Sequence, residues 1–177
     1  MRKLLMATAL CCMTMMSVSL TACGGDDEPN VPVEPAKDTT PAFVLMKFTY
    51  EATQDMLDYC NVVVKYNDGT GEKNETMTTT SWSKTVKAAL PATLSFDREV
   101  TLKADKDITA VEKFTYCNSY SNPYEIVNKS GESLSKGGSS TGTSSSFSGA
   151  QVEQLITAGR LNLSHTYTFD KNGNKSE

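Results

Sequence analysis

Apolar and polar residues alternate with a period of two along most of the chain after residue 42, as is typical of β-strands with one buried face. The alternation is found in residues 44–51, 60–66, 90–102, 108–117 and 161–169. We expect a bend at Arg98, where a charged residue interrupts the third of these runs.

Two further strands are expected from weaker signals. The Asn67-Asp68-Gly69 turn signal precedes a threonine-rich run, residues 73–82, which we expect to pair back as a hairpin. Residues 124–128 are expected to form a short edge strand, whose start Pro123 would suit.

A single helix is predicted, just before the last strand. Ser148 and Gln151 have the spacing of a capping box, in which each side chain satisfies a backbone N–H at the start of a helix. Val152, Leu155 and Ile156 form a short apolar stripe, and Gly159 supplies a stop signal. Because so short a helix is unstable alone, we expect it to pack on the sheet.

These elements predict one all-β domain over residues 42–177. About seven short strands with intervening turn signals favour a β-sandwich, immunoglobulin-like in the loose sense, and a small barrel is the main alternative. The chain departs from true immunoglobulin domains, because Trp82 lies 22 residues after Cys60 and no Asp-x-Tyr-x-Cys motif precedes Cys117. The expectation therefore concerns architecture and not family membership.

One segment inside the domain has the composition of a flexible linker. Sixteen of the twenty residues from 130 to 149 are Ser, Gly or Thr. Loops of this length without secondary structure are either functional or disordered. We expect a disordered Ser/Gly-rich loop here.

The N-terminus carries the features of an export signal. Two basic residues, Arg2 and Lys3, precede an uncharged, mostly apolar run, residues 4–22, that is marginally short for a membrane span. The run ends in Leu20-Thr21-Ala22-Cys23, which resembles the lipobox of bacterial lipoproteins. That resemblance implies a signal peptide over residues 1–22 and lipid chains, palmitate among them, on Cys23. The alternative is an ordinary signal peptide with a chance cysteine.

Residues 23–41 are predicted to be an extended, proline-rich linker. The acidic cluster 26–28 resembles the surface-export signal of Bacteroidota lipoproteins, which implies an outer-membrane protein that faces the cell exterior; a solvated acidic start to the linker is the alternative. Asp38-Thr39-Thr40 resembles the O-glycosylation site of exported Bacteroidota proteins, with Thr39 as the acceptor.

The charge balance disfavours nucleic acid as a partner. Without Arg2 and Lys3, 15 basic and 21 acidic residues remain, which is a net charge of −6. Nucleic-acid binding needs basic patches that this composition does not favour.

Cys60 and Cys117 are the two cysteines that remain after Cys23, each within a Tyr-Cys-Asn tripeptide. An exported protein meets an oxidising compartment, so a disulfide between them is one interpretation. Two buried free thiols that pack as small apolar groups are the other.

No motif predicts catalysis or metal binding, and we expect no cofactor. His165, the one histidine, lies on the apolar face of the last strand, where a core or rim role is expected. The acidic pairs Asp55 with Asp58 and Asp105 with Asp107 lie in turn-like sequence, where Asp caps backbone donors. The segment 170–174 resembles the start of a calcium loop but lacks the later glutamate ligand, so we expect a terminal turn.

A loop that includes Asn118, Ser119, Tyr120, Asn122 and Tyr124 is the candidate binding surface, with ordinary turn chemistry as the alternative. The sequence thus favours a non-catalytic binding or interaction module, held at the membrane by its lipid anchor, whose partner is a glycan or an envelope protein. A structural subunit of an envelope complex and a carboxylate-based hydrolase are the alternatives.

Overall fold

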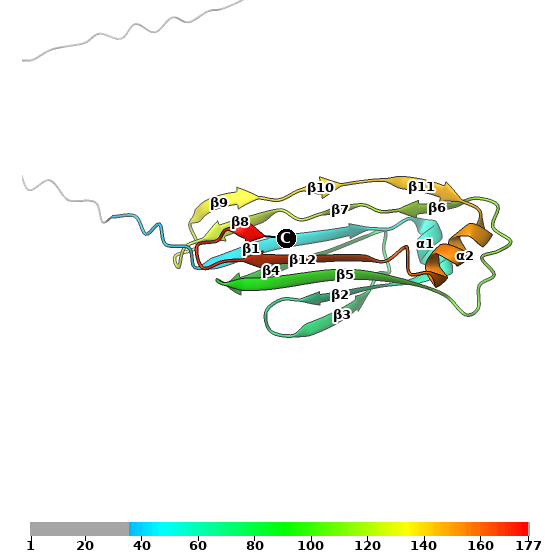
Figure 1. Ribbon diagram of the computed structural model, residues 1–177, viewed down its shortest axis with the longest axis horizontal. Helices are drawn as coiled ribbons and strands as arrows, with labels where there is room; N and C mark the ends of the chain where they lie inside the picture. The colour runs from blue at the N-terminus through cyan, green and yellow to red at the C-terminus, as the bar shows by residue number, and fades with distance from the viewer. Residues whose placement is uncertain (1–35, 177) are drawn as a thin grey trace, which may run out of the picture. The chain divides into compact units, whose positions relative to one another are not determined.

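The computed structural model describes residues 36–176, which form two stacked layers of antiparallel strands, with helices in two of the connections (Figure 1). One layer is a six-stranded sheet with a separate two-stranded sheet in line with it, and we call these together the first sheet; the other layer, a five-stranded sheet, is the second sheet. The predicted all-β sandwich is therefore confirmed. Among the described strands no backbone pairing joins one sheet to the other, so the barrel alternative is wrong. The predicted signal peptide, Cys23 and the linker up to residue 35 lie outside the described residues.

The first sheet is built around β1, which pairs with β4 on one side and with β7 and β8 on the other. The segments β6, β7 and β8 follow one another in a single line beside β1, and β11, β10 and β9 pair with them in a second line (Figure 1). The bounds are β1 (Phe43–Glu51), β4 (Ser81–Ala89), β6 (Phe114–Cys117), β7 (Tyr120–Ser121), β8 (Tyr124–Val127), β9 (Ser133–Gly137), β10 (Ser140–Thr141) and β11 (Ser144–Phe147).

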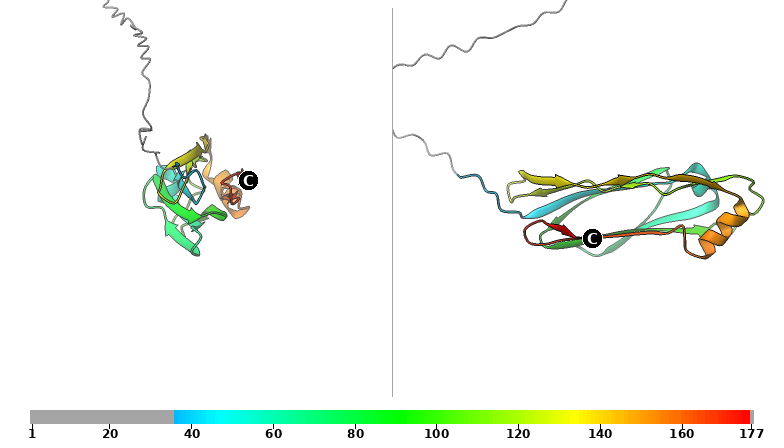
Figure 2. Two further views of the ribbon diagram at one scale, coloured as in Figure 1. Left: turned by 90° about the vertical axis from the view of Figure 1, so that its left-hand side faces the viewer. Right: turned by 45° about the horizontal axis from the view of Figure 1, so that its top comes forward.

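The second sheet has the order β3-β2-β5-β12-β13, and its strands β5, β2 and β3 lie beneath β1 in the view of Figure 1. Its bounds are β2 (Cys60–Asn67), β3 (Glu72–Thr76), β5 (Ala92–Leu102), β12 (Leu163–Phe169) and β13 (Lys175–Ser176). The turned view in Figure 2 shows the two sheets as separate layers with α2 (Gly149–Thr157) at one end of the sandwich.

The two helices close that same end (Figure 1). In α2 the predicted capping box is present, because the Ser148 hydroxyl accepts from the Gln151 N–H and the Gln151 side chain accepts from the Ser148 N–H. Val152 is fully buried, so the helix docks as expected. The second helix, α1 (Gln54–Tyr59), is six residues long, is capped by the Thr53 hydroxyl and was not predicted. Neither α1 nor α2, the helices within residues 36–176, has the length and apolar character needed to span a membrane.

The expected disordered loop over residues 130–149 is wrong, since β9, β10 and β11 occupy it. These strands form the outer line of the first sheet, and most of their side chains are exposed on both faces. Without a buried face there is no apolar alternation to predict them. Position 137 requires glycine, because the Tyr124 side chain occupies the space where a Cβ would be. A Cβ there would lie only 2.5 Å from the Tyr124 hydroxyl.

Four other strand predictions need correction. Residues 124–128 were expected to form an edge strand, but β8 lies between β1 and β9. The threonine-rich run 73–82 divides: β3 pairs with β2 as predicted, whereas Trp82 belongs to β4 in the opposite sheet. Only residues 114–117 of the run 108–117 form a strand, because Asp107 caps a turn at its start by accepting from the Thr109 N–H. The strand β5 has no interruption at Arg98, and it keeps its pairing with both β2 and β12 through that residue.

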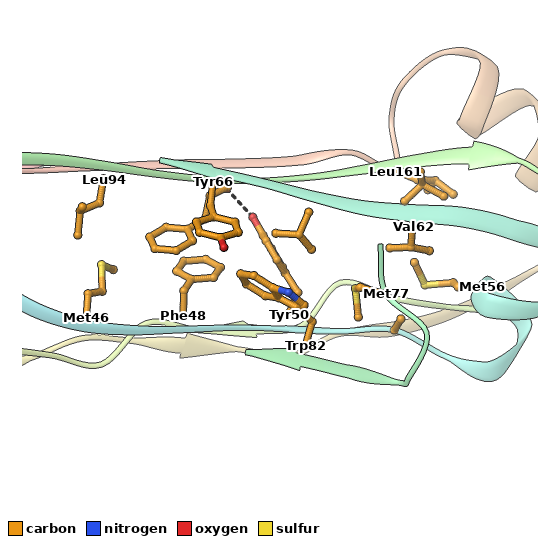
Figure 3. Packing of buried hydrophobic residues seen from close by; sticks show 14 of the residues in the cluster. Met46, Phe48, Tyr50, Met56, Val62, Tyr66, Met77, Trp82, Leu94 and Leu161 are labelled. Atoms are coloured by element: carbon orange, nitrogen blue, oxygen red, sulfur yellow. Dashed lines mark hydrogen bonds between the residues drawn. The ribbon is translucent and has the colours of Figure 1, made fainter. Parts of the chain in front are cut away.

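The core lies between the sheets and is rich in aromatic rings (Figure 3). Phe48 of β1 stacks on Phe96 of β5, with ring centroids 4.4 Å apart. The Tyr50 hydroxyl, which is buried beside them, donates to the Phe96 carbonyl at 2.7 Å. Such a buried hydroxyl needs a partner, and this bond fixes the distance between the two sheets at mid-strand.

Candidate functional site

Two residues singled out in the sequence, Tyr120 and His165, meet at one lateral side of the sandwich. Tyr120 comes from β7 in the first sheet and His165 from β12 in the second, and their ring centroids are 4.0 Å apart. Phe48 lies beneath both, at 5.9 Å from the Tyr120 ring and 5.4 Å from the His165 ring. Both upper rings are partly exposed. The strand order brings them together, and no feature of the sequence predicts the contact.

A notch of about 190 Å³ opens beside this aromatic pair. Its lining consists of Tyr120 and four consecutive residues of β12: Ser164, His165, Thr166 and Tyr167. Aromatic rings beside hydroxyl groups can bind either a sugar or a polypeptide. We name the notch and the adjoining strand β12 the open side of the sandwich.

Buried hydrogen bonds hold the open side in shape. The Asn122 side chain, which is 1% exposed, donates to the Tyr167 hydroxyl at 2.5 Å. The side-chain carbonyl oxygen of Asn122 accepts from the Ser139 N–H, also at 2.5 Å. Asn122 therefore ties β12 to both lines of the first sheet, which is a structural role that the loop expectation did not foresee.

Tyr124, the other aromatic candidate, does not join the notch. Its ring packs on Phe169, with centroids 5.1 Å apart, and a separate hollow of about 390 Å³ lies beside it on the outer face of the first sheet. Leu45 and the charged residues Lys47, Glu125 and Lys136 contribute to that hollow. The expected binding loop thus splits between two places.

Arg98 is fully buried between the sheets, an unusual place for a charged side chain. One guanidinium nitrogen donates to the carbonyls of Glu51 and Cys117, at 2.8 and 3.1 Å, and the other donates to the Tyr116 hydroxyl at 2.7 Å. Burial lowers the pKa of Arg98, while Tyr116 and Tyr50 act in the opposite direction. Because all of these acceptors belong to the first sheet or to the loops beside it, we interpret Arg98 as a structural residue that links the two sheets.

At the opposite lateral side, which we name the closed side, Glu75 of β3 joins the two sheets. Its carboxylate accepts from Lys84 at 2.7 Å, from the Tyr66 hydroxyl at 2.6 Å and from the Trp82 indole N–H at 2.8 Å. These hydrogen bonds, chiefly the one from Lys84, lower the pKa of Glu75 to about 2. Trp82 is only 8% exposed, so it offers no flat platform for a sugar.

Both domain cysteines are free thiols in the structure, but Cys117 is partly exposed, so only Cys60 fits the interpretation as a buried thiol. Cys60 is buried, and burial raises the pKa of its thiol to about 11. A thiol with so high a pKa is a poor nucleophile at neutral pH. The Cys117 sulfur lies 3.1 Å from the Ser119 hydroxyl oxygen.

Four of the candidate carboxylates accept hydrogen bonds, three of them from residues nearby in sequence and one, Asp55, from a distant strand. Asp55 accepts from the Thr115 N–H and Asp58 from the Gln54 side chain, both at 2.7 Å. Asp107 caps the turn at Thr109, and Asp170 closes the terminal turn by accepting from Asn172 and Asn174. Within residues 36–176 no cluster of His, Cys, Asp and Glu has the arrangement of a metal site.

In comparisons with known proteins, no family model, no curated protein and no solved structure matches this chain.

Proposed function

We propose that this protein is a cell-surface lipoprotein of the outer membrane, anchored through Cys23, whose β-sandwich is a non-catalytic interaction module. The lipobox-like sequence that ends at Cys23 supports the anchor, and the acidic cluster 26–28 supports the surface location. The proline-rich linker, residues 23–41, would hold the domain away from the lipid. Two or more acyl chains are enough for stable attachment.

The observation that carries the interaction role is the open side. It places the Tyr120–His165 pair, two hydroxyl side chains and a strand edge around one notch. Among the acidic residues considered, Asp55, Asp107 and Asp170 accept hydrogen bonds from backbone N–H groups, and Glu75 joins two strands. The buried guanidinium of Arg98 donates to two backbone carbonyls and a tyrosine hydroxyl. These features favour binding over the carboxylate-based hydrolase.

The anchor is tested in cells with Cys23→Ser. Wild-type protein is expected to incorporate radiolabelled palmitate and to be digested when protease is added to intact cells. The Cys23→Ser protein is expected to lose the label and the membrane association, while Cys60→Ser serves as the matched control. Equal labelling of the two variants would contradict the anchor, and protection from protease would contradict only the surface location.

The domain's role is tested with the mature chain, residues 23–177, in detergent. We expect no turnover of glycans, esters or peptides, and we expect Tyr120→Ala to weaken attachment of the module to its partner. Hydrolysis that disappears on substitution of a single carboxylate would overturn the non-catalytic role.

Thr39 is the proposed O-glycosylation site, and its side chain is exposed. Thr39→Ala is expected to remove a glycan mass from the mature chain, as measured by mass spectrometry of the intact protein. An unchanged mass would contradict the site.

One observation favours a second role, that of a structural subunit in an envelope complex: the open side includes a strand edge without charge. Isolation of the membrane complex with a second protein in fixed stoichiometry would favour this role over binding of a free glycan.

A further inference from the structure

The edges of the two sheets differ in how they are protected. An edge strand presents unpaired backbone groups, and charged residues or glycine breaks discourage another strand from pairing there. Among the described strands, β3 carries Glu72, Lys73 and Glu75, and β4 carries Lys84 and Lys87. The outer line β9–β11 is short and is interrupted by glycine residues.

The strand β12 has none of these protections. Residues 161–169 include no Asp, Glu, Lys or Arg, no proline and no glycine, and the last four of them are Thr, Tyr or Phe. Such residues favour extended backbone. The contrast marks β12 as the edge to which another strand can be added.

The direction of the backbone groups follows from two hydrogen bonds. The Val100 N–H of β5 donates to the Asn162 side chain at 2.9 Å, so even-numbered residues of β5 direct their N–H groups toward β12. They pair with the odd-numbered residues of β12, as in Arg98 with Leu163. On the other side of β12, the Asp170 N–H donates to the Asn174 carbonyl at 3.0 Å. Even-numbered residues of this strand, Ser164 and Thr166 among them, therefore direct their backbone groups away from β5.

The chain itself shows that this edge accepts a partner strand. The two-residue strand β13 pairs antiparallel with β12, with Ser176 opposite Thr168. Within residues 36–176 no strand continues that pairing beside Ser164 and Thr166. The notch lies at these same residues, with the Tyr120 ring on its far side.

We propose that the edge of β12 at Ser164 and Thr166 binds an extended, uncharged segment of a partner polypeptide by β-strand addition. The added strand would continue the line of β13, and one of its side chains would enter the notch beside Tyr120. Backbone hydrogen bonds would supply the affinity and the notch the selectivity. The described residues that line the notch include no Asp, Glu, Lys or Arg, so a charged side chain that entered it would lose hydration without finding an ion partner in the lining. Lys175 of β13 lies beside this edge, but its ammonium group is already placed over the Tyr167 ring, 4.9 Å from the ring centroid. This inference deepens the proposed interaction role and rests on it, but it is independent of the anchor.

The test uses the mature chain in detergent and a capped peptide of alternating threonine and valine. The valine nitrogens of the peptide are methylated, which blocks one edge and prevents the peptide from forming sheets with itself. We expect it to bind and to slow amide hydrogen exchange at Ser164 and Thr166. The same peptide with every nitrogen methylated cannot donate hydrogen bonds and is expected not to bind.

The matched protein variants are Thr166→Pro and Thr166→Ala. Proline removes an N–H that faces away from β5 and leaves the ladder between β5 and β12 in place, whereas alanine removes only the side chain. We expect Thr166→Pro to weaken peptide binding about tenfold, whereas Thr166→Ala, which keeps the N–H and loses one hydroxyl of the notch, should weaken it only about twofold. Should Thr166→Pro fail to fold, the fully methylated peptide applies the same test to the unaltered protein.

The outcomes separate this inference from the proposed function. Equal binding of the two peptides, or protection of amides away from β12, would overturn strand addition. If no peptide binds while Tyr120→Ala still weakens attachment to a glycan, strand addition is wrong and the interaction role stands. A dimer of the domain that Thr166→Pro abolishes would overturn the choice of partner, because a second copy would occupy the edge. Hydrolysis of the peptide would overturn the interaction role itself.

Discussion

The two sheets of this sandwich are joined by different kinds of interaction at its two lateral sides. On the closed side, β3 and β4 belong to different sheets, and the Glu75 carboxylate joins them by accepting from Lys84 and Trp82. On the open side, Asn122 and Tyr167 join the sheets from within, and the edge of β12 carries no charge. Both sides are held together, but charged residues lie on both edge strands of the closed side, whereas β12 itself is uncharged and has Lys175 of β13 beside it, 4.9 Å from the Tyr167 ring centroid.

The difference shows how charge decides which edge of a sandwich can take part in binding. A strand that approached β3 would have to displace or desolvate the ionised Glu75 and its donors, which is unfavourable. A strand that approached β12 would meet hydroxyl groups, aromatic rings and backbone groups that face outward. Strand addition at the open side therefore requires less desolvation of charged groups than at the closed side.

The largest effect is expected from Arg98→Met, which breaks the interior tie that both sides share. The substitution leaves the carbonyls of Glu51 and Cys117 and the Tyr116 hydroxyl without their buried donor. We expect the free energy of unfolding to fall by about 2–4 kcal/mol, as measured by urea denaturation. Arg160→Met, at an exposed position, is the control. Equal or higher stability of Arg98→Met would mean that the cost of burying the guanidinium exceeds the gain from its hydrogen bonds.

Glu75→Gln is expected to have a smaller effect, because it removes the charge that joins β3 to β4 on the closed side. Its carboxylate is partly exposed, so solvent screens the interaction, and we expect a loss of about 1 kcal/mol at neutral pH. A pKa of about 2 in the folded protein lies below the ordinary value of 4.5. The ionised form therefore stabilises the fold above about pH 4.5, and this contribution is lost as the pH falls toward 2.

The measurement is thermal unfolding of wild type, Glu75→Gln and Glu72→Gln between pH 2 and 7. Glu72 lies on the same strand with an exposed side chain, so its variant is expected to follow wild type. The difference between wild type and Glu75→Gln should shrink toward pH 2. A difference that stays constant with pH would show that Glu75 stabilises the closed side by packing and not by its charge.

The sequence predicted those strands and the helix whose signals are local, that is, contained within the element itself. Alternation in residues 44–51, 60–66 and 161–169 located β1, β2 and β12, because each has one face in the core. The capping box at Ser148 located α2 for an equally local reason. Residues 130–149 escaped prediction because an edge line with both faces exposed has no alternation.

The contacts between distant segments were not predictable in the same way. Tyr120 belonged to the candidate loop and His165 was expected in the core or at its rim, but their contact depends on the strand order of both sheets. Arg98 suggested a bend because a charged residue inside an apolar run contradicts burial, and the three oxygens that accept from it lie far away in sequence. The uncharged run 161–169 was the one visible signal of the open edge.

The smallest effect is expected from Thr166→Lys, which gives the open side a charge like those on the closed side. The Thr166 side chain is exposed, so stability should change by no more than about 0.5 kcal/mol. Binding of the threonine–valine peptide should weaken on the order of threefold, since a lysine on an edge opposes strand pairing. Thr93→Lys, an exposed position on the central strand β5, adds the same charge away from the edge and should leave binding unchanged. If both lysine variants weaken binding equally, the effect is one of general charge, and the lack of charge on β12 does not explain why that edge is open.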